Sequence, residues 1–447
     1  MVAERALTFP KGGIHPDDNK ALTAGMPVEI LPPPKEVRLL LKQHAGAPCE
    51  PLVKKKDRVT EGDLIGSMGD RVGANLHASV SGTVKRLGRI MHPAGGKVPA
   101  IVIATDMEAG PKSYASHDWT SLSRDRILAR IRDAGVVGLG GAGFPAAVKL
   151  ALKPDARVDT LILNGAECEP YLTSDHRIML EHAPEVVTGA KIILSVLGIR
   201  NCVIGIEENK ADAIQVLRAS AADGASQDGF RVSVQPLKVK YPQGAADQIM
   251  QSITGRVRPS GVRSSAIGVI VQNVYTAKAI YDAVVLGKPF YERVVTLSGR
   301  GIVRPANLKV RLGTSIADLV DHLGGTTPDL AKIVLGGPMT GYAISSLEVP
   351  ITKTTSGVLF LTRQETDLQC HYPCIRCGFC LEACPMGLEP NNIGIYVEAG
   401  RGDETERFGV NDCYECGSCA FVCPSKRPLV QFVRLAKNAL EQKRRQS

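Results

Sequence analysis

The chain has 447 residues, enough for about three domains of ordinary size with substantial buried cores. Its 44% apolar and 22% charged residues match a folded globular protein, and no uninterrupted apolar run is long enough to span a membrane. The net charge of +9 favours acidic partners, whereas a single Trp with ten Tyr and nine Phe argues against a stacking surface for single-stranded nucleic acid.

The amino-terminal segment does not have the pattern of an export signal. Glu4 and Arg5 precede any apolar stretch, which is unlike a secretory leader. We therefore expect a cytoplasmic protein whose cysteines stay reduced.

A glycine-rich loop follows the first clear helical pattern. Residues 123–134 predict a helix with a Ser cap, and Gly138 to Gly143 then read GLGGAG. A Rossmann fingerprint needs a strand before this loop, so that interpretation fails. Pro145 suits the start of a second helix, where the loop could bind a phosphate with Lys149 as a point charge. A helix–loop–helix turn is the alternative interpretation.

The next segment alternates strands and helices. Residues 158–163 predict a strand that ends in the polar sequence NGAECEPY, in which Glu167 or Glu169 could accept hydrogen bonds from ribose hydroxyls. A solvated loop is the alternative. Further helices are expected at 184–197, 210–219 and 275–285, with strands at 201–206, 232–240 and 267–272. This alternation predicts α/β layers.

Clustered cysteines carry the strongest signal in the sequence. Of the twelve cysteines, eight lie between Cys374 and Cys423 in two copies of C-x2-C-x2-C-x3-C-P. In two-cluster ferredoxins three cysteines of such a motif hold one cluster and the fourth holds the other. We therefore predict two [4Fe–4S] clusters with interleaved ligand sets. The sets are Cys374, Cys377, Cys380 and Cys423, and Cys384, Cys413, Cys416 and Cys419.

Zinc and disulfides are the alternatives for this segment. Zinc usually takes two separated C-x2-C pairs, and disulfides are disfavoured in a large chain without an export signal. The other cysteines are expected to be buried or linker residues, although Cys168 lies in the polar strand end. They are Cys49, Cys168, Cys202 and Cys370.

The carboxyl terminus predicts one more helix. Residues 431–447 place Phe432, Ala436 and Leu440 on one face, and basic residues follow at the end. We expect this helix to cover the cysteine-rich domain. Contact with an anionic membrane or a partner subunit is the alternative.

Four motifs resemble the FMN- and NADH-binding segments of the flavoprotein subunit of respiratory complex I: GLGGAGFP with Lys149, NGAECEPY, YPQGAADQ and VQNVYTAKAI. The chain as a whole resembles the RnfC family. FPKGGIHP at 9–16, GGPMTGYAI at 336–344 and the doubled cysteine motif carry this wider resemblance. The family implies a peripheral subunit of the Rnf complex, which exchanges electrons between NADH and ferredoxin through ion-pumping membrane partners.

The resemblance also implies which residues bind cofactors. Asn164 and Asn273 match asparagines that hold the flavin, Glu167 and Glu169 match acidic positions at the nucleotide pocket, and Tyr241 lies in the loop beside it. In that loop a glutamate pair of the flavoprotein is replaced by Gly-Ala-Ala at 244–246. The residues expected to cradle FMN and the nicotinamide nucleotide are Gly138, Gly140, Gly141, Ala142, Gly143, Phe144 and Lys149.

The implied architecture is multidomain, α/β and α+β. Residues 1–110 would hold a barrel-sandwich module similar to biotinyl and lipoyl domains, and residues 111–290 the FMN/NADH-binding α/β domain. A soluble-ligand-binding β-grasp module would occupy 291–365, and a 2[4Fe–4S] ferredoxin-like domain with a C-terminal helix 366–447. The barrel-sandwich module lacks the lysine of a swinging cofactor, because VGAN at 72–75 stands in that hairpin.

The implied activity is that of an NAD(H)-dependent flavin and iron–sulfur oxidoreductase subunit. Hydride carries two electrons and a cluster accepts one, so a flavin between them is expected and no catalytic side chain is needed. The implied complex translocates Na+ or H+, and this subunit would lie at the cytoplasmic face of the plasma membrane. Integral membrane and iron–sulfur subunits, and ferredoxin or flavodoxin, would be its partners, with no nucleic acid.

Two other functions remain open at this point. One is a soluble, bifurcating NADH:ferredoxin oxidoreductase subunit built from the same parts. The other is an electron-relay scaffold whose glycine loop binds no nucleotide. The sodium-pumping NADH:quinone reductase has a similar subunit, but that family lacks the doubled cysteine motif.

Overall fold

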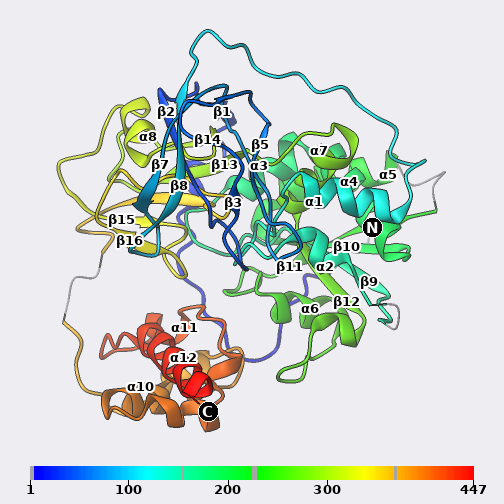
Figure 1. Cartoon of the computed structure of the whole chain (residues 1–447). Helices are drawn as coiled ribbons and strands as arrows, with labels where there is room; N and C mark the ends of the chain where they lie inside the picture. Colours follow the sequence, from blue (N-terminus) through cyan, green and yellow to red (C-terminus); the bar gives the residue numbers. More distant parts are fainter. Residues whose placement is uncertain (1–4, 154–155, 224–228, 367–369, 447) are drawn as a thin grey trace.

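The computed structural model describes residues 5–153, 156–223, 229–366 and 370–446. These residues form three β-containing modules packed together and a smaller helical domain below them (Figure 1). The expected multidomain α/β and α+β architecture is confirmed. Two residues named above lie outside the described residues: Glu4, from the amino-terminal segment, and Ser447, the last residue of the expected C-terminal helix.

The N-terminal module is a sandwich of two antiparallel sheets. Val37 and Leu39, two residues apart and therefore on the same face of their strand, pair with Ile103 and Ile101 in the core, and all four are fully buried. One sheet contains β2 (Glu36–Leu40), β8 (Lys97–Thr105), β7 (Gly82–Met91) and β4 (Arg58–Val59). The other contains β3 (Glu50–Pro51), β5 (Leu64–Ser67) and β6 (Leu76–His77).

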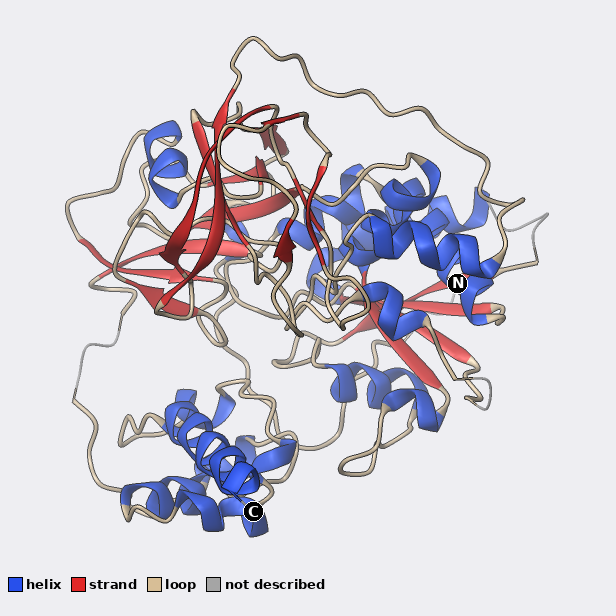
Figure 2. Cartoon of the chain, viewed as in Figure 1, coloured by secondary structure: helices blue, strands red, loops and turns tan. Residues whose placement is uncertain are grey.

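The central domain is a four-stranded parallel sheet with helices on both faces (Figure 2). Leu161, Ile162 and Leu163 are fully buried, as expected for a strand that is covered on both sides. The strand order is β11 (Arg231–Leu237), β10 (Asn201–Glu207), β9 (Thr160–Asn164) and β12 (Val269–Asn273). The alternation of strands and helices expected for this region is confirmed.

Among the described residues, helices pack on both faces of this sheet. Ile249 and Met250 of α6 (Ala246–Thr254) pack on the first face. The second face holds α4 (Ala183–Leu197), α5 (Ala211–Asp223) and α7 (Val274–Val285), and α1 (Arg124–Asp133), α2 (Ala146–Leu150) and α3 (Ser174–Glu181) pack against these helices. The expected Ser123 cap of α1 is present, and its side chain accepts the Arg126 amide.

A six-stranded mixed sheet forms the third module. Its helix α8 (Ile316–His322) starts with a capping box between Ser315 and Asp318. The sheet order is β1 (Val28–Ile30), β14 (Ala306–Arg311), β13 (Glu292–Ser298), β17 (Gly357–Thr362), β15 (Leu330–Leu335) and β16 (Tyr342–Ile344). Strand β1 comes from the amino-terminal segment and pairs in parallel with β14, so this segment completes a sheet outside the barrel-sandwich module.

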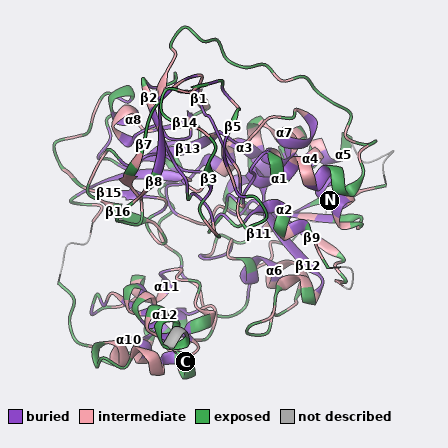
Figure 3. Ribbon diagram, in the orientation of Figure 1, coloured by how far each residue is buried: buried purple, intermediate pink, exposed green. Residues whose placement is uncertain are grey.

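The C-terminal domain is small and helical. Its core is formed by Ile393, Val410, Val433, Ala436 and Leu440, and the last helix covers it as expected (Figure 3). The helices are α9 (Phe379–Ala383), α10 (Pro390–Glu398), α11 (Ser418–Phe421) and α12 (Leu429–Gln446). Short 3-10 helices lie at Lys20–Leu22, Glu208–Lys210, Ser264–Ile267, Gly402–Phe408 and Val410–Asp412. Within the described residues, no helix is both long and apolar enough to cross a bilayer.

Candidate cofactor sites

The strand order of the parallel sheet creates a ligand-binding edge. Strand β9 lies between β10 and β12, so the order reverses beside it, and ligands of open α/β sheets bind outside the carboxyl ends of strands at such a point. Asn164 ends β9, Asn273 ends β12, and the two are paired in register. Gly140 packs against Asn273, because a Cβ at Gly140 would lie 3.1 Å from the Asn273 amide nitrogen. Three of the predicted cofactor residues therefore meet at this edge.

The tip of the glycine loop is open and offers backbone donors. Gly140, Gly141 and Ala142 are exposed, and their amides form no hydrogen bond within the described part of the chain. A Cβ at Gly141 would meet no atom within 4 Å. Phe144 is 43% exposed beside the loop. Free amides in such a loop are the donors that a phosphate group needs, so the loop fits a phosphate-bearing cofactor.

The helix after the loop is shorter than the sequence pattern suggests. Helix α2 spans only Ala146–Leu150, so the loop amides rather than a helix dipole would meet a phosphate. Lys149 Nζ donates to the Val271 carbonyl, and burial lowers its pKa to about 8. Its ammonium group therefore contacts the middle of β12 instead of the loop tip.

Two buried cations lie beneath the loop, and both come from the third module. Arg293 Nη2 donates to the Leu139 carbonyl at 3.1 Å, and Lys353 Nζ donates to the Gly135 carbonyl at 2.7 Å. Burial lowers the pKa of Arg293 to about 10 and that of Lys353 to about 8. Neither has a carboxylate within hydrogen-bonding distance among the described residues. Sequence reasoning missed both, since each lies more than 150 positions from its loop partner.

The barrel-sandwich module also contacts the loop. The Ala45 amide donates to the Gly143 carbonyl at 3.2 Å. Gly143 has φ +67°, and a Cβ there would lie 2.6 Å from Thr354 Cγ2. Only glycine fits this position without strain. The loop is thus held by all three larger modules.

Asn164 and Asn273 form hydrogen bonds with backbone and side-chain groups at the sheet edge. Asn164 Nδ2 donates to the Gly244 carbonyl at 2.7 Å. Asn273 Oδ1 caps α7 by accepting two backbone amides, and its Nδ2 donates to Asp175 Oδ2 at 2.6 Å. Burial, followed by the nearby Glu167 carboxylate, raises the pKa of Asp175 to about 7.

The two glutamates that the sequence offers as ribose acceptors have partners within the protein. Glu167 accepts the backbone amides of Asp175 at 2.7 Å and His176 at 3.2 Å, so it caps the start of α3. Glu169 accepts the Met339 amide at 3.2 Å and the Thr340 hydroxyl. Burial raises the pKa of Glu169. Both carboxylates therefore already have partners, because the loop after β9 folds back onto α3 and the third module.

Tyr241 contacts the cysteine domain. Its hydroxyl donates to the Cys416 carbonyl at 2.6 Å, in the second cysteine motif, and the residue is 3% exposed. A second contact lies nearby, where Arg258 Nη2 donates to Tyr414 Oη at 2.7 Å and to Asp247 Oδ2 at 2.8 Å. The loop that carries Tyr241 thus joins the central domain to the cysteine domain.

The amino-terminal segment fills the same junction (Figure 1). The Gly13 amide donates to the Ala383 carbonyl at 3.0 Å, and the Ile14 amide donates to the Tyr241 carbonyl at 2.8 Å. A Cβ at Gly12 would lie 2.6 Å from the Cys384 carbonyl. The motif FPKGGIHP therefore needs its glycines for close backbone approach.

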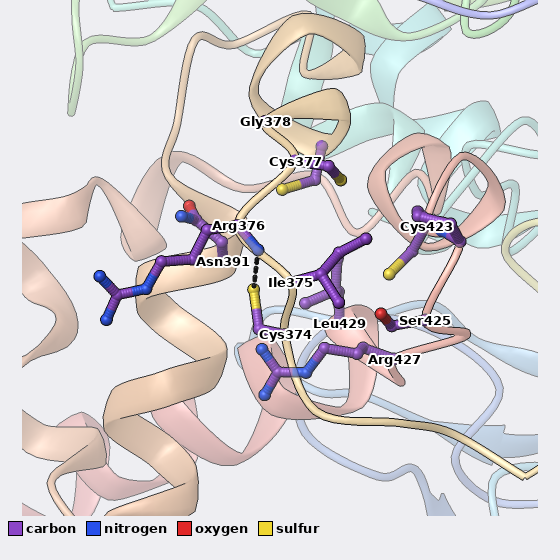
Figure 4. Close-up of a pocket in the computed structure, with 12 residues that line it drawn as sticks. Cys374, Ile375, Arg376, Cys377, Gly378, Asn391, Cys423, Ser425, Arg427 and Leu429 are labelled. Atoms are coloured by element: carbon purple, nitrogen blue, oxygen red, sulfur yellow. Dashed lines mark hydrogen bonds between the residues drawn. The ribbon is translucent and has the colours of Figure 1, made fainter.

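The eight clustered cysteines line two separate cavities. Each cavity takes three cysteines from one motif and the last cysteine of the other. The first, with about 350 Å³ of empty space, is lined by Cys374, Cys377, Cys380 and Cys423 (Figure 4). The second, with about 380 Å³, is lined by Cys384, Cys413, Cys416 and Cys419.

The two motifs adopt the same loop conformation. Arg376 and Glu415, at equivalent positions, have φ +57° and +58°, and Gly378 and Gly417 both have φ +84°. The Arg376 amide lies 3.4 Å from Cys374 Sγ, and the Glu415 amide lies 3.3 Å from the equivalent sulfur of its own motif. Backbone N–H groups aimed at cysteine sulfurs suit thiolate ligands of a cluster.

The pattern of the cysteines fits a multi-iron cluster better than one ion. Zinc usually takes two separated C-x2-C pairs, whereas each cavity takes three cysteines at triplet spacing and the last cysteine of the other motif. Burial, together with the neighbouring Cys416 and Cys384, raises the pKa of Cys413 to about 11. Four converging thiolates therefore require a bound cationic centre.

Known proteins with similar sequences cover almost the whole chain. A subunit of the proton-translocating ferredoxin:NAD(+) oxidoreductase complex of Clostridium ljungdahlii is 45% identical over 96% of this chain and 93% of its own length. The corresponding protein of the Na(+)-translocating ferredoxin:NAD(+) oxidoreductase complex of Acetobacterium woodii is 40% identical over 97% of this chain and 98% of its own length. The corresponding subunit of the ion-translocating oxidoreductase complex of Rhodobacter capsulatus is 41% identical over 97% of this chain and 83% of its own length. The RnfC barrel sandwich hybrid domain matches residues 7–108. The chain belongs to the RnfC family.

Other family models divide the rest of this RnfC-family chain as the structure does. The Nuo51 FMN-binding domain matches residues 131–282, and the SLBB domain matches residues 294–343. The 4Fe-4S dicluster domain matches residues 373–426. The two cysteine cavities are formed mainly by residues of the last match, and the glycine loop lies inside the FMN-binding match.

Solved structures show the same fold in more distant proteins. A chain of an NAD+-reducing [NiFe]-hydrogenase in the H2-reduced state aligns with a TM-score of 0.50 at 18% identity, over 74% of this chain and 62% of that chain. A chain of such a hydrogenase in the air-oxidized state aligns with a TM-score of 0.51 at 16% identity, over 72% of this chain and 66% of that chain. At this identity the likeness concerns the fold of the RnfC-family chain.

Proposed function

We propose that this chain passes electrons between NAD(H), FMN and two [4Fe–4S] clusters, as a subunit of a complex that couples ferredoxin:NAD+ oxidoreduction to Na+ or H+ transport. Its family membership supports the reaction, since relatives that match nearly end to end carry this activity in their names. Ferredoxin or flavodoxin, integral membrane subunits and a place at the cytoplasmic face of the membrane belong to the same proposal.

One observation carries the proposal for this particular chain. An open glycine loop at the switch point of a parallel sheet and two four-cysteine cavities occur in one chain, and Tyr241 joins the two parts through Cys416. When bound, FMN exchanges two electrons with NADH and single electrons with the clusters. The protein must therefore hold the cofactors close together and exclude water.

The residues divide this work between binding and positioning. The free amides of Gly140, Gly141 and Ala142 would bind phosphate, and the buried Arg293 and Lys353 would favour the bound anion. Asn164 and Asn273 would orient the flavin at the strand ends. The eight cysteines that line the two cavities would hold the clusters.

The test is an electron paramagnetic resonance spectrum of the chain, purified anaerobically with its cofactors, before and after adding NADH. We expect signals of reduced clusters on NADH addition, at about two spins per chain when both clusters reduce. Clusters that reduce with dithionite but not with NADH would contradict the proposal and favour an electron-relay scaffold. Absence of clusters after reconstitution would contradict the ligand assignment.

A further inference from the structure

The two cysteine cavities differ in the side chains that complete their walls. The first is lined by Asn391, Ser425, Arg427 and the exposed Arg376 in addition to its cysteines. The second is lined mainly by Leu388, Ile393, Val430 and Val433. Its one charged residue, Glu415, already accepts hydrogen bonds from Arg434 and Lys437. The first cavity therefore has polar groups in its wall that need an explanation, whereas the wall of the second cavity is mainly apolar.

Arg427 is the most unusual of these groups. It is 2% exposed. Its Nη2 donates to Glu398 Oε2, whereas its buried Nε and Nη1 have no partner among the described residues. Its guanidinium carbon lies 5.3 Å from the centre of the Phe432 ring. In Figure 4 its side chain runs along the cavity with the guanidinium group toward Cys374.

Unpaired buried donors are costly and therefore rare in native proteins. A guanidinium carries its N–H groups in a rigid fork, so two unused donors beside a cavity indicate an acceptor inside that cavity. The sulfur atoms of an iron–sulfur cluster are such acceptors. Hydrogen bonds to these sulfurs and nearby positive charge stabilise the reduced cluster, because reduction adds one negative charge.

We propose that Arg427 donates hydrogen bonds to the cluster held by Cys374, Cys377, Cys380 and Cys423, and makes its reduction potential more positive than that of the other cluster. This inference rests on the proposed function, which supplies the clusters. Its consequence is a direction for electron flow. The second cavity faces the central domain through Tyr241, so electrons that enter there move to a more easily reduced cluster at the first cavity.

The test is a redox titration of the cluster-loaded chain followed by electron paramagnetic resonance, which gives the midpoint potential of each cluster. In Arg427→Met, which removes the donors and the charge, we expect the more positive midpoint to become more negative. A tenfold change in the one-electron equilibrium constant corresponds to about 59 mV, and we expect at least this change. The other midpoint should stay in place.

A second variant is expected to shift the same midpoint potential in the opposite direction. Glu398 pairs with Arg427, and its side chain is 44% exposed. Glu398→Gln removes the counter-charge without entering the cavity, so the same midpoint should become more positive. A purely structural role of Arg427 would not produce shifts of opposite sign in these two variants. Arg401→Met, which removes a surface arginine paired with Glu404, is the matched control and should move neither midpoint.

Iron content and dithionite-reduced spectra separate this inference from the proposed function. A chain without about eight irons would contradict the proposed function itself. Intact clusters whose midpoints stay fixed, or move together, in both variants would overturn the role of Arg427. If Arg427→Met does not retain its clusters, Glu398→Gln decides, because an unmoved midpoint in that variant overturns the inference.

Discussion

Gly141 shows at the scale of one residue how a loop can be open for a ligand. Nothing in the described chain lies within 4 Å of a Cβ built at Gly141, so Gly141→Ala should fold normally. The methyl group would stand beside the free loop amides and hinder a phosphate. We expect an unchanged melting temperature of the apoprotein and about a tenfold weaker FMN affinity, measured by flavin fluorescence titration.

Gly110 provides the control for that substitution. It is also exposed with open space around a built Cβ, but it lies in the segment between the barrel-sandwich module and α1. Gly110→Ala should change neither the melting temperature nor FMN affinity. Equal FMN affinities of the two variants would show that the loop tip does not contact the cofactor.

Asp175 predicts a pH dependence of stability. Burial raises its pKa in the folded protein to about 7, from an ordinary value of 3.8. The folded state therefore binds more protons than the unfolded state between about pH 4 and pH 7. The contribution of protonated Asp175 to the free energy of unfolding is full below about pH 4 and is lost as the pH rises through 7. Asp175→Asn should match wild type near pH 4 and exceed it by about 1–2 kcal/mol at pH 8.

The measurement is thermal unfolding of the apoprotein between pH 4 and pH 8, with Asp321→Asn, an exposed position on α8, as the control. The amide of the Asp175 variant can still accept the hydrogen bond from Asn273, so packing at the sheet edge is retained. A constant difference between Asp175→Asn and wild type across this range would exclude the predicted titration.

At the scale of elements, helix α3 depends on a carboxylate from the loop before it. Glu167 accepts two amides of the first turn of α3. Glu167→Ala leaves these donors unsatisfied and removes a favourable charge at the helix start, so the free energy of unfolding should fall by about 1–2 kcal/mol. This corresponds to a melting temperature lower by about 2–8 °C in a domain of this size.

Glu208→Ala is the matched control, because Glu208 is exposed on a neighbouring short helix. It should leave the melting temperature unchanged. NADH affinity of Glu167→Ala, measured on the folded protein, should stay within about twofold of wild type if capping is the only role of Glu167. A large loss of NADH affinity without loss of stability would support the ribose role expected from the sequence.

At the scale of the whole molecule, the junction between the central domain and the cysteine domain rests on a few hydrogen bonds. Tyr241→Phe removes the hydroxyl that donates to the Cys416 carbonyl. That carbonyl then loses its partner, at a cost of about 1–3 kcal/mol to the docked arrangement. We expect cluster reduction by NADH to slow about tenfold, while reduction by dithionite and FMN affinity stay unchanged.

Stopped-flow absorbance of the cluster band measures both rates. Tyr396→Phe is the control, since its hydroxyl contacts Arg407 within the cysteine domain and lies outside the junction. If NADH reduces the clusters of both variants equally fast, the Tyr241 contact has no part in electron transfer between the domains.

Local patterns predicted the elements and the cysteine loops well. The Ser123 cap, the buried run of β9 and the doubled cysteine motif depend on residues within a few positions of one another, so spacing alone reveals them. The site residues with distant partners were harder to predict. Glu167 and Glu169 have the residue type of ribose acceptors, but their partners lie on α3 and in the third module.

The sequence by itself determined the fold class, the glycine loop, the two cysteine motifs and the family, because propensity, periodicity and ligand spacing act over short stretches of chain. Only the tertiary structure decided that Arg293 and Lys353 lie beneath the loop, that Tyr241 faces Cys416, and that Arg427 completes one cavity and not the other. These arrangements depend on burial and on contacts between segments far apart in the chain. A buried charge or an unpaired donor has meaning only once its surroundings are known.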